Sequence, residues 1–234
     1  MDKLFFYLIV VTTNIIQTVS GFAGTMLAMP VSISLIGFDQ ARFILNFLGL
    51  LVSIIVLIKE KKHVNFKSII EVIIFMVIGI VVSKLLVNYI SRNILFFAYG
   101  IVIILFSIYQ LSGKRIVLNH AFSIILLILA GIIHGLFVSG GALLVIYAMG
   151  KYKDKNEFRA NMSLIWVILN SILLLSFIYE GNFTTDYKML GLSIFFTLIG
   201  VWSGGKLIDK INQKRFEFIT KCLLLTMGII IIFS

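Results

Sequence analysis

Long apolar runs constrain the fold of this chain more than any other feature of its sequence. They cover residues 4–37, 43–58, 68–88, 94–111, 121–150, 160–179, 189–206 and 216–233. A membrane crossing takes about 20 apolar residues. Since 60% of the residues are hydrophobic and only 13% are charged, a soluble fold of this size could not bury the apolar surface. We therefore expect an all-α polytopic membrane protein.

The charged residues favour a bilayer over a nucleic acid as the partner. The net charge is +10, but the basic residues lie in short clusters between apolar runs, as in loops that orient a membrane protein. We expect a multi-pass protein of the cell (inner) membrane. The single cysteine, Cys222, cannot form an intramolecular disulfide. His63 and His120 lie in loops and have no metal-ligand spacing with His134, so no metal or cofactor is predicted.

Two of the apolar runs, 4–37 and 121–150, are too long for one crossing. Small residues interrupt each run near its middle, at residues 20–25 (SGFAGT) and 134–141 (HGLFVSGG). Because glycine weakens a helix by about 1 kcal/mol relative to alanine, these clusters predict breaks. The alternative is that the glycines only allow two helices to pack closely. The recurrence of the pattern in both halves favours the breaks.

The two halves align when the chain is shifted by about 117 residues, which predicts repeats at 1–116 and 117–234. Each repeat contains a broken run (4–37 or 121–150) and three ordinary helices. The second helices carry matching stripes of Arg42, Asn46, Gly49 and Ser53, and of Arg159, Ser163, Trp166 and Asn170. Their spacings place each stripe on one helical face. Such a face lines a watery interior or forms a polar helix contact.

The distribution of positive charge distinguishes two topologies. If each broken run crosses once, the 20 Lys and Arg residues are spread over both sides. If each broken run is a hairpin, only Lys3, Arg42, Lys84, Arg92 and Lys188 lie on one side and the other fifteen face the opposite side. The second arrangement fits the positive-inside rule. We therefore predict two inverted repeats, each a broken or re-entrant helical hairpin plus three transmembrane helices, with both termini extracytoplasmic.

Inverted repeats with broken helices usually hold a substrate near the midplane. Half-helices that begin near Gly24 and Gly140 would direct their N-termini, which favour anions, at such a site. The predicted substrate-binding residues are Ser20, Gly21, Gly24, Thr25, Arg42, Asn46, His134, Ser139, Gly140, Gly141, Arg159 and Ser163. His134 can donate to an anion or carry a proton, or it can make an interhelical hydrogen bond. Arg42 and Arg159 can gate an anion from opposite faces, or extend to the membrane interface.

No Asp or Glu lies deep in a predicted crossing, which argues against a buried carboxylate relay. No cluster of nucleophile and base residues is present, so we do not expect an enzyme. The leading hypothesis is a secondary transporter of a small anionic substrate. A homodimer is compatible with this hypothesis. The alternatives are a channel or carrier for a neutral or cationic solute, and a membrane assembly protein without transport.

The two breaks also carry a family resemblance. Residues 21–24 (GFAG) through Pro30, and Gly135 through Gly141, resemble the glycine-rich segments of the TauE/SafE family of sulfite exporters and sulfonate permeases. The sequence departs from that pattern at Thr25, where glycine is common, and at Ile146, where proline is expected. The resemblance implies transport of sulfur-containing or other small organic anions, such as sulfite, sulfonates or sulfoacetate. With the leading hypothesis, it predicts an exporter that works by alternating access.

Overall fold

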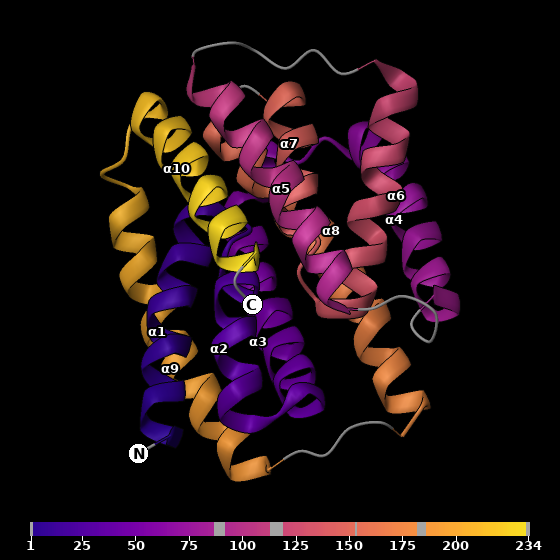
Figure 1. Cartoon of the computed structure of the whole chain (residues 1–234). Helices are drawn as coiled ribbons and strands as arrows, with labels where there is room; N and C mark the ends of the chain where they lie inside the picture. The colour runs from indigo at the N-terminus through magenta and orange to yellow at the C-terminus, as the bar shows by residue number, and fades with distance from the viewer. Residues whose placement is uncertain (1, 87–91, 113–118, 153, 182–185, 233–234) are drawn as a thin grey trace.

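The chain is helical throughout the part that the structure describes (Figure 1). The structure is a computed structural model and describes residues 2–86, 92–112, 119–152, 154–181 and 186–232. These residues form ten α-helices and no strand, which confirms the all-α prediction. Six of the helices among them are long and apolar enough to cross a membrane.

The helices follow the apolar runs but begin or end a few residues beyond them. They are α1 (Asp2–Ser20), α2 (Gly24–Ile36), α3 (Phe38–Glu60), α4 (Phe66–Leu86), α5 (Arg92–Leu111), α6 (His120–Phe137), α7 (Gly141–Lys151), α8 (Lys155–Tyr179), α9 (Tyr187–Ile208) and α10 (Gln213–Ile232), with a 3₁₀ turn at Lys61–His63. α8 takes in a polar first turn because Asp154 accepts hydrogen bonds from the backbone N–H groups of Asn156 and Glu157. The predicted helix ends at 88 and 233 and the repeat boundary at 116/117 lie outside the described residues.

Ion pairs identify the two ends of the helix bundle. Lys3, at the start of α1, pairs with Asp186 at an N–O distance of 3.1 Å, and this end is called the N-terminal end. At the opposite end Lys59, in the last turn of α3, pairs with Asp209 at 3.4 Å. This second end also holds Lys61–His63 and is called the basic end (Figure 1).

Each of the two long apolar runs is a pair of helices that starts and finishes at the same end. α3 reaches the basic end from Phe38, so α2 finishes at the N-terminal end, where α1 begins. α6 and α7 make the second pair, at the basic end. There His120 and Lys151, at the start of α6 and the end of α7, both lie within 4 Å of the Glu71 carboxylate, at 3.4 and 3.7 Å. The breaks between these helices therefore lie inside the bundle.

Helices of the two halves pair with one another across the bundle. α1 packs against α9 and α4 against α6, while α3 packs against α8 and α5 against α10. Exchanging the halves turns the first of these pairs into the second and each of the other two into itself, as related halves require. The polar stripes of α3 and α8 are buried there, with Asn46, Ser53, Ser163 and Asn170 each at most 3% exposed. The inverted symmetry of the two halves stays a prediction.

Candidate functional site

The two helix breaks are turns with left-handed backbone at matching positions. Gly21, after the end of α1, has a φ of +85°, and Val138, which ends α6, has a φ of +54°. These residues are 117 positions apart. Ser20 stabilises the first turn by accepting hydrogen bonds from the backbone N–H groups of Phe22 and Ala23 at 3.4 and 3.3 Å. A β-branched residue such as valine rarely adopts this conformation, so the second turn is strained.

The helices that begin at these breaks have no capping side chain at their N-cap residues. The helices α6, α8 and α9 begin near the ends of the bundle, and their N-cap side chains, Asn119, Asp154 and Asp186, accept backbone hydrogen bonds. α2 and α7 follow Ala23 and Gly140, which have no side chain that can do so. Because an N-terminus without a cap leaves N–H donors and partial positive charge, both starts can attract an anion.

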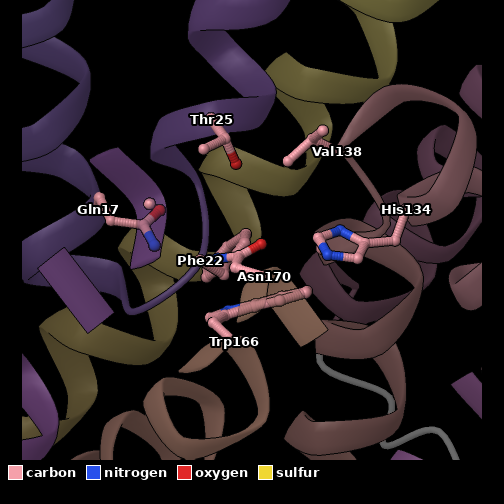
Figure 2. A pocket seen from close by; sticks show the side chains of 9 residues that line it. Gln17, Phe22, Thr25, His134, Val138, Trp166 and Asn170 are labelled. Atoms are coloured by element: carbon pink, nitrogen blue, oxygen red, sulfur yellow. The ribbon is translucent and has the colours of Figure 1, made fainter. Parts of the chain in front are cut away.

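A small cavity lies between the two breaks (Figure 2). Its lining residues come from both halves and are Gln17, Phe22, Thr25, Gly49, His134, Val138, Gly141, Trp166 and Asn170. None of them is a carboxylate or a permanently charged residue, and most of the polar ones carry N–H or O–H donors. The free volume is about 10 Å³, roughly the room that one water molecule needs.

His134 is the titratable side chain of this cavity. It is 2% exposed, and neither imidazole nitrogen makes a hydrogen bond of standard geometry. Its polar neighbour is the carboxamide of Asn170, and its ring lies 5.1 Å from the ring of Trp166. Since buried polar groups nearly always have a hydrogen-bond partner, this imidazole is available to a ligand in the cavity.

Gln17 lies across the cavity from His134 (Figure 2). The two residues are 117 positions apart, so each holds the same place in its own half. The Gln17 side-chain oxygen accepts a hydrogen bond from the N–H of Gly24 at 2.6 Å, which leaves its amide N–H groups free to face the cavity. The indole N–H of Trp166 donates to the carbonyl of Gly21 at 3.1 Å and holds α8 against the first break.

The two arginines of the polar stripes stabilise the ends of the broken helices. Arg42 donates to the carbonyl of Gly135 at 2.9 Å, and Arg159 donates to the carbonyl of Thr18 at 3.0 Å. Arg159 also pairs with the buried carboxylate of Glu60. Each arginine thus binds the last turn of the broken helix of the other half, where the helix dipole is negative.

Two aromatic rings pack against the guanidinium group of Arg42. Its guanidinium carbon lies 5.1 Å from the ring centre of Phe38 and 4.9 Å from that of Phe177. Phe177 is 117 positions after Glu60, so the two halves surround their arginines with different chemistry at the same place. Neither Arg42 nor Arg159 lines the central cavity.

The structure divides the predicted site residues into three groups. Thr25, His134 and Gly141 line the cavity. Ser20, Gly21, Gly24, Ser139 and Gly140 form the two turns or start the helices after them. Arg42, Arg159, Asn46 and Ser163 lie behind the cavity wall on α3 and α8, where Asn46 donates to the carbonyl of Asn170 at 2.9 Å.

Sequence reasoning missed Gln17, Phe22 and Val138 as cavity residues. The repeat register could have identified Gln17, because subtracting 117 from His134 gives its position. Gly49, Trp166 and Asn170 lay on the predicted stripes but were not selected as binding residues. Gly49 matters because a Cβ there would come within 3.0 Å of the Thr25 methyl group.

Comparison with known proteins identifies the family. The chain matches the family model described as "Sulfite exporter TauE/SafE" over residues 6–231. No curated protein and no solved structure matches the chain. The family is one of transporters and not of enzymes, and it implies a membrane transporter of sulfite-type anions. With nearly its whole length matched, the chain belongs to the sulfite exporter TauE/SafE family.

Proposed function

We propose that this protein exports a small sulfur oxyanion, namely sulfite, a sulfonate or sulfoacetate, and binds it in the central cavity. The observation that carries the proposal is the meeting of two helix N-termini without N-cap side chains, those of α2 and α7, at a cavity lined by hydrogen-bond donors. A carboxylate among the lining residues would repel an anion, and the cavity has none.

The chemistry of the lining suits an oxyanion in three ways. The N-termini of α2 and α7 supply partial positive charge and backbone N–H donors. Gln17, Thr25 and His134 can donate from their side chains. Gly141, at the start of α7, lets an anion approach the backbone closely. An oxyanion that replaced water here would therefore find hydrogen-bond donors for its oxygens.

The size of the cavity supports a mechanism of alternating access. Its free volume of about 10 Å³ is too small for a multi-atom oxyanion, so the protein must rearrange to admit one. The two halves contribute opposite walls, with Gln17 from one and His134 from the other. Movement of one half against the other would open the cavity toward one end of the bundle at a time.

The charge at the two ends of the bundle supports the proposal of export. The positive-inside rule places the basic end in the cytoplasm of the cell and both termini outside it. Lys59, Lys151 and Lys155 lie at or near that end. A cluster of cations at the cytoplasmic entrance would raise the local concentration of anions before they are exported.

Purified protein in proteoliposomes tests this function. Vesicles loaded with sulfite are expected to lose it faster than protein-free vesicles, and competing sulfonates should slow the loss. A sulfite flux that stays at the protein-free level, while sodium or a neutral solute moves, would overturn the proposal. His134→Leu serves as the variant of the site, because it removes a cavity donor without adding charge.

A further inference from the structure

A second cavity, of about 300 Å³, lies at the basic end of the bundle, apart from the central one. It is formed by the last turns of α3 and α9, the start of α8 and the end of α1. Its polar lining consists of Thr18, Lys59, Arg159, Lys206 and Asp209, and its apolar lining includes Ile55, Val56, Val201 and Trp202. It is thus large enough for a group that the central cavity cannot hold.

The floor of this cavity is buried and holds the guanidinium group of Arg159. Arg159 is 1% exposed, and its two hydrogen bonds, to Glu60 and to the carbonyl of Thr18, use only two of its five N–H donors. Its buried Nε–H group makes no hydrogen bond. An unpaired guanidinium donor below an open cavity is a place for an acceptor oxygen.

The rim of the cavity is exposed and also cationic. The ammonium nitrogen of Lys206 lies 3.5 Å from the centre of the Trp202 ring, and Lys59 lies beside it with its ion-pair partner Asp209. Among the residues described, Lys206 has no carboxylate partner, whereas Lys84 near the other end of the bundle pairs with Glu180 at 2.6 Å. Together the rim and floor hold three cations, of which Lys59 is paired with Asp209 and Arg159 with Glu60.

Exposed apolar side chains lie on the helices that form the open side of the cavity. On α9, Trp202 and Leu198 are 63% and 46% exposed, and on α3 Ile58 is 65% exposed. Exposed apolar side chains on helices long enough to span a membrane contact acyl chains. Tryptophan and lysine side by side at a helix end are typical of the depth of the lipid headgroups.

We propose that this cavity binds the headgroup phosphate of an anionic phospholipid. Lys59 and Lys206 contact the phosphate at the rim, Arg159 attracts it from the floor, and the acyl chains lie along the exposed face between α3 and α9. The charge of the lining, the interfacial tryptophan and the apolar outer wall select this occupant over a free ion. Basic pockets between membrane helices recognise lipid headgroups in this way.

Lipid retention measured by native mass spectrometry in neutral detergent tests the site. Phosphatidylglycerol should remain on the wild-type protein in preference to phosphatidylcholine. Each lysine removed, in Lys59→Gln and in Lys206→Gln, is expected to reduce retention about fivefold, and Trp202→Leu should reduce it as well. Lys84→Gln is the matched control. It also removes one lysine, but Lys84 lies on α4 near the opposite end of the bundle, so lipid retention should stay unchanged.

Three results would overturn the proposal. These are equal retention of the two lipids, equal losses in Lys84→Gln and Lys206→Gln, and thermal stabilisation by inorganic phosphate or sulfite that Lys206→Gln abolishes while lipid retention stays the same. The last result would assign the cavity to a free oxyanion. None of these measurements involves transport, so their failure is distinct from a failure of the proposed export.

Discussion

Substituting the two adjacent glycines at the start of α7 separates the structural role of this turn from its role in binding. A methyl group on Gly141 would lie 3.3 Å from the carbonyl oxygen of Phe22 and 3.6 Å from the Trp166 ring, which the structure can accommodate with a small shift. A methyl group on Gly140 would overlap the backbone carbonyl of Ala130 in α6. Replacing glycine by alanine is therefore tolerated at position 141 but clashes with the backbone of α6 at position 140.

The magnitudes follow from these contacts. Gly141→Ala gains up to about 1 kcal/mol in helix propensity, which offsets the tight contact, so stability should change little. The methyl group fills the cavity of about 10 Å³ and keeps an anion from the α7 N–H groups. Losing one such charged hydrogen bond costs about 1.5–3 kcal/mol, which weakens binding by roughly 10- to 150-fold. Gly140→Ala should instead cost about 3 kcal/mol by overpacking.

Two assays on the same preparations distinguish these outcomes. Thermal unfolding in detergent should show the wild-type midpoint for Gly141→Ala and a fall of roughly 6–12 °C for Gly140→Ala. Sulfite efflux from proteoliposomes should show a KM for Gly141→Ala raised by about tenfold or more. An unchanged KM and maximal rate in Gly141→Ala would refute the assignment of the cavity as the binding site.

Three further predictions follow from the described contacts. His134→Gln, which gives both halves the same residue, should keep partial sulfite transport while His134→Leu loses it, and equal rates in both variants would contradict a donor role. Arg159→Met should destabilise the protein by about 3–5 kcal/mol in denaturant titrations because it leaves the Glu60 carboxylate buried without its partner; the double variant with Glu60→Leu should recover part of that loss, and no recovery would mean that the helix-end hydrogen bond to Thr18 dominates. Single cysteines at 62 and 151 in a Cys222→Ser background should react with an impermeant reagent from one side of the membrane and a cysteine at 188 from the other, and labelling of 62 and 151 from opposite sides would exclude the hairpin topology.

The sequence predicts the helices well because a bilayer demands long apolar segments. The breaks could also be located, since glycine and serine clusters interrupt runs that are too long for one crossing. Val138 was unpredictable, because a valine in left-handed backbone contradicts the residue preference that normally marks such a turn. The predicted start of α7 at Gly140 is nonetheless within one residue of its observed start at Gly141.

The site was harder to predict because the role of each residue depends on its contacts with the other half of the chain, which local sequence patterns do not reveal. Arg42 and Arg159 looked like gates for an anion, yet both donate to helix-end carbonyls some hundred residues away in the chain. Gln17 was not selected from the sequence, although the repeat register places it at the position equivalent to His134. The register had already matched Arg42 with Arg159, but it carries no information on the helix-end carbonyls that they contact.

The reciprocal arginine contacts have a consequence for biogenesis. Thr18 leaves the ribosome long before Arg159, so the first hairpin must enter the membrane with the end of α1 unsupported until α8 is made. For Gly135 the order is reversed, because Arg42 is synthesised before α6 and can bind the Gly135 carbonyl as soon as α6 inserts. The second hairpin can therefore form its arginine contact as it is synthesised, and the first hairpin gains its own contact only when α8 follows. If the chain is cut between its two halves, each fragment should fold stably in the membrane only when both fragments are produced in the same cell.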